Sequence, residues 1–374
     1  MSDITFNINH GPGNARNSEG AFLQTASGRI RFVYSRYMGD SPYDGASCDL
    51  AEVYSDDDGE TWHDRGVVIP RGDADNIMSV SLLRIAPDDV RMFYLEKRAL
   101  ARRNHTAPAQ NDGRSSCVPM MRRSADDGET WSEAKRLIPF DEYYILNNDR
   151  VIRLASGRIV MPLAHHRFRT GRSLCAGVVF TLYSDDNGIS WRESDTVLCP
   201  NFQAETIWGF QEPGMIELEP GHLWLWTRTH LGFQFTSHSY DDGVTWNAAV
   251  PDLNFPSPSF PSPMSVKRDP ETGILYAIWN GTDRQLHPVL PHPAGDGRSP
   301  LVMIRSLDNG KTWERKRPVF LETDPERGYC YTAMEFLSNG KLLLAYCCGR
   351  LLDGLNELQD LKIRKLNVNE LWKD

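Results

Sequence analysis

Short stretches in which apolar and polar residues alternate, each preceded by a turn, recur along the whole chain. Alternation with a period of two is typical of half-buried β-strands. Amphipathic patterns of helical length are scarce. The pattern therefore predicts an all-β protein. The six stretches are SGRIRFVY at 27–34, DDVRMFYL at 88–95, SGRIVMPL at 156–163, PGHLWLWT at 220–227, TGILYAIW at 272–279 and NGKLLLAY at 339–346.

A second pattern, S-x-D-x-G-x-(T/S)-W, joins an acidic turn to a tryptophan. The Asp and Ser side chains can bond backbone amides, Gly accepts a positive φ, and Trp buries a large apolar face as the chain returns into a strand. Five copies cannot each be an active site, so we interpret them as structural turns rather than metal sites. They are SDDDGETW at 55–62, SADDGETW at 124–131, SDDNGISW at 184–191, SYDDGVTW at 239–246 and SLDNGKTW at 306–313.

The spacing of the two patterns predicts a sheet repeated around an axis. Successive acidic turns start 69, 60, 55 and 67 residues apart, and short strands repeating at this interval are typical of β-propellers. We predict one domain, 1–374, folded as a six-bladed β-propeller of four-stranded antiparallel blades. Five blades would carry the acidic turn, and strands from the two termini would complete the sixth.

Composition and charge restrict the partners. The chain of 374 residues is 40% hydrophobic and has a net charge of −9, which argues against nucleic acid or an anionic membrane as the main partner. No apolar run is long enough to span a bilayer. The seven cysteines lack zinc-type spacing, and no secretory signal leads the chain. We therefore expect no metal or other cofactor and a cytoplasmic location; the sequence leaves the oligomeric state open.

Polar residues gather where the strand before each alternating stretch begins. In a propeller these strands are innermost, so their first side chains would converge on one mouth of the central channel. Several different functional groups at one place suit a hydroxyl-rich ligand better than a water-filled channel. The residues are Glu19, Asn76, Asn147, Asp149, Gln211, Glu212 and Tyr331.

With five acidic turns in a propeller pattern, the chain resembles the sialidase (neuraminidase) superfamily, whose hallmark is the Asp-box or BNR repeat. The resemblance covers essentially the whole length; its motif is specific for the fold and weak for the substrate. It implies an exo-acting glycoside hydrolase that removes a terminal, acidic sugar from a glycan. It also implies retention of configuration through a tyrosine nucleophile, without a cofactor.

The resemblance extends to the nucleophile and its base. The family's nucleophilic tyrosine precedes a glycine by nine residues, and YTAMEFLSNGKLLLAY places Tyr331 at that position. The family's glutamate beside the tyrosine matches Glu212 in EPGMIELEPGHLWLWTR, which also places Arg228 as an arginine that binds a sugar carboxylate. Such a glutamate would take the phenolic proton, because a phenol with a pKa near 10 is a poor nucleophile at neutral pH.

Two further family positions have matches. An arginine eight residues before a late box serine binds the sugar carboxylate in the family, and Arg298 stands at that distance from Ser306. The family's acid/base aspartate lies on the loop entering the first box. Asp44 matches it, with Asp40 as a nearby rival. The resemblance thus implies bidentate binding of an acidic group by two arginines.

Two positions depart from the family. Ser18 stands where the family has the first arginine of a triad, with Glu19 beside it. Arg16 lies two residues away and could substitute for this arginine as a substrate contact, although the offset, which keeps the strand face, shifts the depth by about 7 Å. Cys347 replaces the family's closing glutamate. An anionic Glu19 would repel a sialic acid unless it is paired, so the glycosidase scaffold is better supported than the sialidase substrate.

Other mechanisms stay open. A carboxylate pair from Glu19, Asp149 and Glu212 would serve a glycosidase or a lyase that acts on a non-sialic sugar. His165 and His166 could transfer protons. A carbohydrate-binding propeller without catalysis is the non-enzymatic alternative, although a binding protein needs no Tyr–Glu pair. Further sugar contacts would come from Asn147, Asn148, Gln211, Trp208 and His165.

Overall fold

The computed structural model describes residues 4–99, 115–169, 172–200, 208–258, 261–281, 298–338, 340–350 and 357–373. Every regular element in these residues is a β-strand, apart from the single turn of α1 (Val368–Leu371). The strands make four-stranded antiparallel sheets, so the prediction of an all-β protein is confirmed. None of the described helices is long and apolar enough to cross a membrane.

Three sheets in the second half of the chain have four antiparallel strands each. The first runs in the order β15 (Gln211–Glu219), β16 (His222–Arg228), β17 (Phe233–Ser239), β18 (Val250–Pro256). The second runs β19 (Ser265–Arg268), β20 (Leu275–Trp279), β21 (Leu301–Ser306), β22 (Val319–Glu322). The third runs β23 (Cys330–Phe336), β24 (Lys341–Cys347), β25 (Leu361–Asn367), β1 (Ile4–Ile8).

The first half of the chain repeats this pairing within one larger sheet. Its units are β2 (Asn14–Gln24), β3 (Ile30–Met38), β4 (Cys48–Ser55), β5 (His63–Ile69); then β6 (Asn76–Ala86), β7 (Asp89–Ala99), β8 (Ser115–Ser124), β9 (Lys135–Arg136); then β11 (Ile152–Arg153), β12 (Ile159–Arg169), β13 (Arg172–Ser184), β14 (Arg192–Glu193). Single parallel pairs join the units: Cys48 with Asn76, and Cys117 with Tyr143 of β10 (Tyr143–Ile145).

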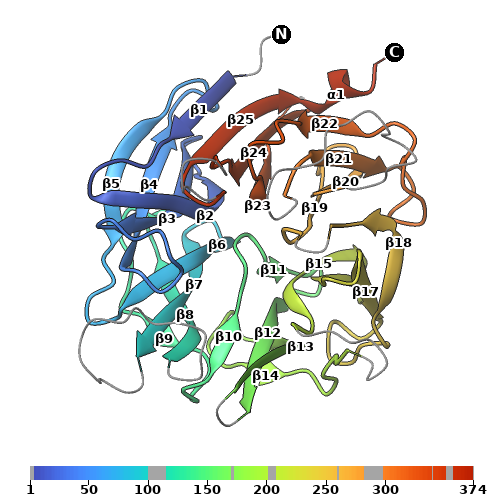
Figure 1. Cartoon of the computed structure of the whole chain (residues 1–374), viewed down its shortest axis with the longest axis horizontal. Coiled ribbons are helices and arrows are strands. Elements are labelled where there is room, and N and C mark those ends of the chain that lie inside the picture. Colours follow the sequence, from blue (N-terminus) through green and yellow to red (C-terminus); the bar gives the residue numbers. More distant parts are fainter. Residues whose placement is uncertain are drawn as a thin grey trace.

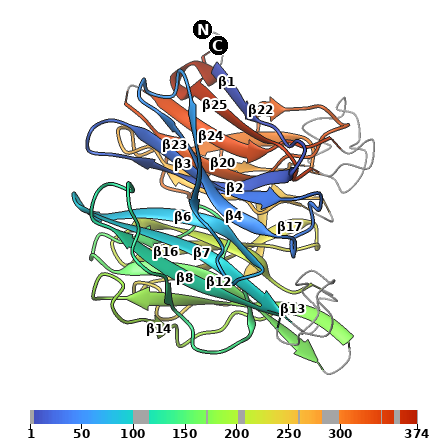
Figure 2. The same ribbon diagram turned by 90° about the vertical axis from the view of Figure 1, so that its left-hand side faces the viewer.

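The sheets are arranged around a centre, with β2, β6, β11, β15, β19 and β23 nearest to it (Figure 1). Neighbouring inner strands contact one another, as β2 does with β6 and β23. The two ends of the chain meet in one sheet, because β1 pairs antiparallel with β25 from Ile4–Lys365 to Ile8–Leu361. Both views show these two strands side by side (Figures 1 and 2).

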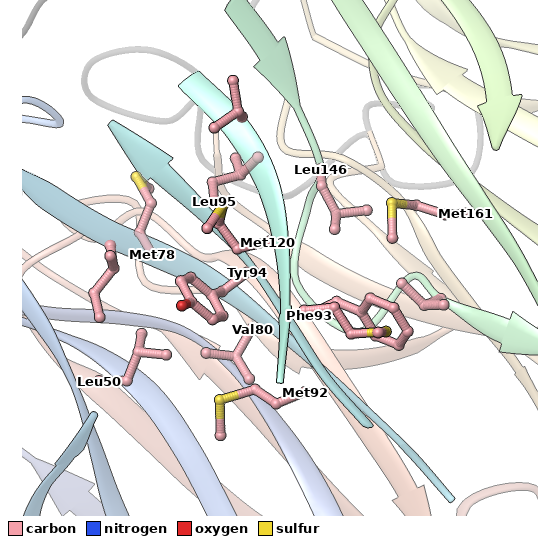
Figure 3. Packing of buried hydrophobic residues seen from close by; sticks show 14 of the residues in the cluster. Leu50, Met78, Val80, Met92, Phe93, Tyr94, Leu95, Met120, Leu146 and Met161 are labelled. Atoms are coloured by element: carbon pink, nitrogen blue, oxygen red, sulfur yellow. The ribbon is translucent and has the colours of Figure 1, made fainter. Parts of the chain in front are cut away.

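The hydrophobic core lies between the sheets. Its largest cluster fills the space among β2–β8, β10, β12 and β13 and contains many methionines. Figure 3 shows Val80, Met92 and Phe93 of this cluster together with Met120 and Met161. Unbranched methionine side chains adapt to irregular gaps, which suits the wedge between sheets that splay from a centre.

The five acidic turns share one set of hydrogen bonds. In the first, Ser55 Oγ accepts from Gly59 N at 2.8 Å and donates to Asp57 Oδ1 at 2.7 Å. Asp57 also accepts from Thr61 N at 2.8 Å and from Thr61 Oγ1 at 2.6 Å. The turns at 124–131, 184–191, 239–246 and 306–313 repeat these contacts. Each aspartate is committed to its own turn.

The turns also hold one sheet against the previous one. A Cβ on Gly59 would lie 2.8 Å from Leu343 of β24, and one on Gly188 would lie 3.0 Å from Met121 of β8. Gly128 approaches Arg31 of β3 in the same way, at 3.3 Å. Two structural requirements therefore explain glycine at this position of each of these turns: the positive φ and the close approach to the neighbouring sheet.

Replacing Asp126 by alanine is expected to lower the free energy of unfolding by roughly 0.5–1.5 kcal/mol, because it removes the side-chain acceptor of the exposed amide and hydroxyl of Thr130. Those bonds hold the pKa of Asp126 at about 2. Its contribution is therefore complete above the unfolded-state pKa of about 4 and is lost as pH falls through about 2. Urea unfolding at pH 7 and pH 3 measures both effects. Replacing exposed Glu133 by alanine is the control; an equal loss in the control would contradict this role for Asp126.

Candidate active site

A cavity of about 410 Å³ opens among the inner ends of the sheets. Part of its wall is continuous with the hydrophobic core, because Met78, Leu95 and Leu146 line it and belong to the cluster of Figure 3. The structure brings eight of the predicted site residues to the lining: Glu19, Asp44, Asn147, Gln211, Glu212, Arg228, Arg298 and Tyr331.

Three of these lining residues share an unusual backbone conformation. Glu19, Glu212 and Tyr331 have φ values of +53°, +46° and +55°. Each lies where the register of its inner strand shifts against the next strand, and such bulges redirect side chains. A non-glycine residue in this left-handed region costs roughly 1–3 kcal/mol and persists only where the surrounding structure imposes it. Ser79 of β6 has the same conformation, with φ +63°, and also lines the cavity.

Tyr331, Glu212 and Arg228 form a hydrogen-bonded chain. The Tyr331 hydroxyl donates to Glu212 Oε1 at 3.0 Å, and Arg228 NH1 contacts Glu212 Oε2 at 2.5 Å. Burial and the Glu212 carboxylate raise the pKa of Tyr331 well above its usual value, while the guanidinium of Arg298, 5.5 Å from the ring centre, acts in the opposite direction. At neutral pH Tyr331 is therefore a neutral phenol whose proton points at a carboxylate.

Glu19 and Asp44 share Arg16 but differ in protonation. Burial raises the pKa of Glu19 to about 7 against the opposing charge of Arg16, whose NH2 lies 3.8 Å from Oε1. Oε2 accepts from Ser79 Oγ at 3.0 Å. The Asp44 side chain is 66% exposed, so its desolvation is only partial; the charges of Arg16 and Lys97 outweigh this desolvation and lower the pKa of Asp44 to about 2. Arg16 NH1 contacts Asp44 Oδ1 at 2.5 Å.

Several predicted contacts lie outside the lining. Arg16 is buried and binds Ser18 Oγ at 3.0 Å in addition to Asp44, so it holds protein groups. Trp208 is 44% exposed, and its carbonyl accepts from Gln211 Nε2 at 2.8 Å. The others bind neighbouring protein groups: Asn76 donates to Ala46 O, Asn148 donates to Gly20 O, Asp149 accepts from Met334 N, and His165 pairs with Glu142.

Comparison with protein families identifies the chain. A model described as a BNR repeat-like domain matches residues 103–344, and a model of the BNR/Asp-box repeat matches residues 53–64. The chain is a sialidase-like member of the BNR-repeat superfamily. A sequence search of curated proteins finds no significant match.

Solved structures show the fold of this BNR-repeat protein independently. Hadza microbial sialidase Hz136 superposes with a TM-score of 0.70 at 17% identity, over 96% of this chain and 66% of its own. The NanB sialidase from Streptococcus pneumoniae gives 0.69 at 15%, over 97% and 70%. The intramolecular trans-sialidase from Ruminococcus gnavus gives 0.72 at 16%, over 100% and 99%. These likenesses show the sialidase-type fold.

The site of this BNR-repeat protein also contains residues that the sequence pattern did not identify. Lys97 is 2% exposed, lines the cavity and donates to Asp44 O at 3.0 Å. Its signal was indirect: a lysine that ends an apolar strand and pairs in register with Asn76, one of the polar strand starts. Of the two histidines considered for proton transfer, His166 lines the cavity and His165, the predicted sugar contact, does not. Burial lowers the pKa of His166 to about 4, so its imidazole is neutral at pH 7.

Proposed function

We propose that this protein is a sialidase-like exo-glycoside hydrolase that removes a terminal sugar from an oligosaccharide or glycoconjugate. The Tyr331–Glu212–Arg228 chain on the cavity wall carries the proposal. A phenol that donates to a carboxylate, itself held by a guanidinium, is the arrangement of an activated nucleophile with its base and an orienting group. A volume of about 410 Å³ is near the lower end for ligand sites and suits one terminal unit.

We also propose that the four-stranded units are six blades of one propeller spanning 1–374. The pairing of β2–β5, β6–β9, β11–β14, β15–β18, β19–β22 and β23–β25 with β1 supports this count. Five of these units carry the acidic turn, and the unit that combines β1 with the C-terminal strands lacks it. In this arrangement the inner strands deliver their bulged residues to a single cavity.

The proposed reaction retains configuration in two displacements. Tyr331 Oη attacks the anomeric carbon as its proton passes to Glu212, and the bond to the leaving oxygen breaks with its electron pair going to that oxygen. Water then attacks the anomeric carbon, the bond to Tyr331 breaks, and Glu212 returns the proton to the phenolate. Arg228 keeps Glu212 oriented in both steps.

The leaving oxygen requires a proton donor, and Glu19 is the second candidate beside Asp44. The family match assigns this role to Asp44, but its ion pair with Arg16 keeps it ionised at neutral pH. Glu19 lines the same cavity and is about half protonated near pH 7. A general acid works best when its pKa lies near the operating pH, so the geometry favours Glu19 as donor and, after the first step, as the base for water.

A panel of aryl α- and β-glycosides tests this function. We expect hydrolysis of at least one member, with kcat/KM falling as pH rises through about 7, where Glu19 loses its proton. Glu19→Gln is expected to remove this fall of kcat/KM with pH. It is also expected to lower the rate of hydrolysis of glycosides with poor leaving groups by roughly 10²–10⁴-fold. Tight binding of a sugar without turnover would identify a carbohydrate-binding protein instead. If kcat/KM of Glu19→Gln still fell in the same pH range, the proton donor would be Asp44 instead.

A further inference from the structure

We propose that the cavity takes a sugar without a carboxylate on its anomeric carbon, and that Glu19 is the residue that excludes such a carboxylate. This inference rests on the proposed function, whose cavity it uses, and it names the substrate class: a neutral, aldose-type terminal sugar. The charged groups of the cavity wall are already paired with one another.

The charged residues that line the cavity are balanced. Three are acidic and three are basic: Glu19, Asp44 and Glu212 against Lys97, Arg228 and Arg298. A ligand carboxylate loses its hydration when it enters the cavity. A site built for an anion would therefore leave at least one cation without a protein counter-charge, so that the attraction of this cation offsets the lost hydration.

Each arginine of the lining has its own carboxylate. Arg228 is paired with Glu212 at 2.5 Å, and Arg298 with Glu357 at 3.1 Å. A ligand carboxylate at either arginine would therefore come close to an anion of the protein as well. Two arginines with two glutamates form a neutral, donor-rich wall rather than an anion site.

Lys97 does not supply the missing cation. Its Nζ donates to the backbone carbonyl of Asp44 at 3.0 Å and lies 5.9 Å from the centre of the Tyr143 ring. Burial would lower the pKa of Lys97, but Tyr143, Cys117, Asp44 and Glu19 raise it above its usual value. The positive charge of Lys97 is therefore already balanced by the carboxylates of Asp44 and Glu19 in the same wall.

Glu19 makes the wall unfavourable to a further anion. Its side chain is 6% exposed, and the nearest guanidinium, Arg16, is shared with Asp44, which Arg16 approaches more closely: 2.5 Å against 3.8 Å. Among the described residues only Ser79 donates a hydrogen bond to the carboxylate of Glu19. A ligand carboxylate beside ionised Glu19 would meet a like charge in a poorly solvated site, where repulsion is strong.

The uncharged groups of the cavity suit hydroxyls. Asn147 Oδ1 is buried without a hydrogen-bond partner in the described part of the chain, and this acceptor needs a donor, which a hydroxyl provides and a carboxylate cannot. Arg298 Nε and NH1 also lack hydrogen bonds to the described residues; with the charge of Arg298 balanced by the ion pair with Glu357, these donors can bind a hydroxyl or ring oxygen. Met78, Leu95 and Leu358 supply apolar surface for the C–H faces of a sugar.

The exclusion depends on ionised Glu19, so it is expected to strengthen as pH rises through about 7. Protonated Glu19, the form that donates to the leaving oxygen, repels no carboxylate, and the exclusion at lower pH then rests on the pairing of Arg228 and Arg298 with glutamates. Other groups near Glu19 set this pH. Among them, Arg16 and Lys97 favour its ionised form, and Asp44 and Glu212 oppose it. The further titratable neighbours are Tyr37, Cys48, Cys117, Tyr331 and Cys347.

The test compares two ligands that differ only in charge. They are the methyl α-glycoside of N-acetylneuraminic acid and its C1 carboxamide, titrated by calorimetry into the full-length protein at pH 8 and pH 5.5, beside a panel of neutral methyl aldosides. At pH 8 we expect wild type to bind at least one aldoside and to bind the carboxamide at least tenfold more tightly than the acid. Glu19→Gln is expected to reduce this preference to roughly twofold, and so is the lower pH.

Asp64→Asn is the control, because it removes a carboxylate that is 62% exposed on β5; it should leave the preference unchanged. Tighter binding of the acid by wild type at pH 8, or an unchanged preference in Glu19→Gln, would overturn the inference. Absence of binding by every ligand would overturn it as well. Binding of an aldoside without hydrolysis of its aryl glycoside would refute the proposed function and leave the specificity of the cavity standing.

Discussion

Tyr331→Phe is expected to reduce kcat by roughly 10³-fold or more while leaving sugar binding within a few-fold of wild type. The change removes only the hydroxyl that donates to Glu212 at 3.0 Å, so the ring, its burial and its place beside Arg298 are kept. Loss of a nucleophile affects the chemical step rather than ground-state binding. The measurement is single-turnover hydrolysis of the best aryl glycoside, together with calorimetric binding of the corresponding methyl glycoside.

The matched control is Tyr276→Phe. Tyr276 is also buried, but it packs against Phe336 and Trp372 and does not line the cavity. It should keep wild-type turnover. If Tyr331→Phe retained more than about a tenth of the activity, the tyrosine would not be the nucleophile, and the pair of Glu19 and Glu212 would become the better mechanism.

Gly177→Ala is expected to cost stability and activity together. A Cβ at this position would lie 2.1 Å from the carbonyl oxygen of Phe210, and backbone atoms cannot move aside as a flexible side chain can. Gly177 N donates to Trp208 O, and Gly177 O accepts from Phe210 N, both at 2.9 Å. Displacing this segment also displaces Glu212, two residues further on. We expect unfolding in urea at a lower concentration, with a loss of roughly 1–3 kcal/mol or more.

The control for this prediction is Gly11→Ala, because no atom lies within 4 Å of the added Cβ. That variant should unfold and turn over like wild type. A Gly177→Ala protein with normal stability and normal kcat/KM would show that the segment before Glu212 accommodates the methyl group. The position of the base would then not depend on this contact.

The strands and turns could be predicted because their signals are local. Alternation within SGRIVMPL or NGKLLLAY fixes which side chains are buried, and the Ser, Asp and Gly of each acidic turn supply its hydrogen bonds within eight residues. The polar strand starts were likewise visible, and five of the seven predicted there line the cavity. Asn76 and Asp149 instead bind backbone groups nearby.

The remaining features depend on contacts between distant segments. A positive φ is ordinarily a signal for glycine or asparagine, so nothing in the sequence marks Glu19, Glu212 and Tyr331 as left-handed; packing of the inner strands imposes it. The pairing of Arg298 with Glu357 and the burial of Lys97 arise in the same way. These contacts decide the charge balance of the cavity, and they could not be predicted from the sequence, where the family resemblance implied an acidic sugar and Glu19 argued against a sialic acid.

The most direct measurement is a crystal structure of Tyr331→Phe soaked with the neutral glycoside that wild type hydrolyses fastest. The account predicts one sugar ring in the cavity, with its anomeric carbon about 3–3.5 Å from the position of the missing hydroxyl and a ring hydroxyl bonded to Asn147. A sugar bound with its anomeric carbon turned away from residue 331, or bound at another surface, would contradict it.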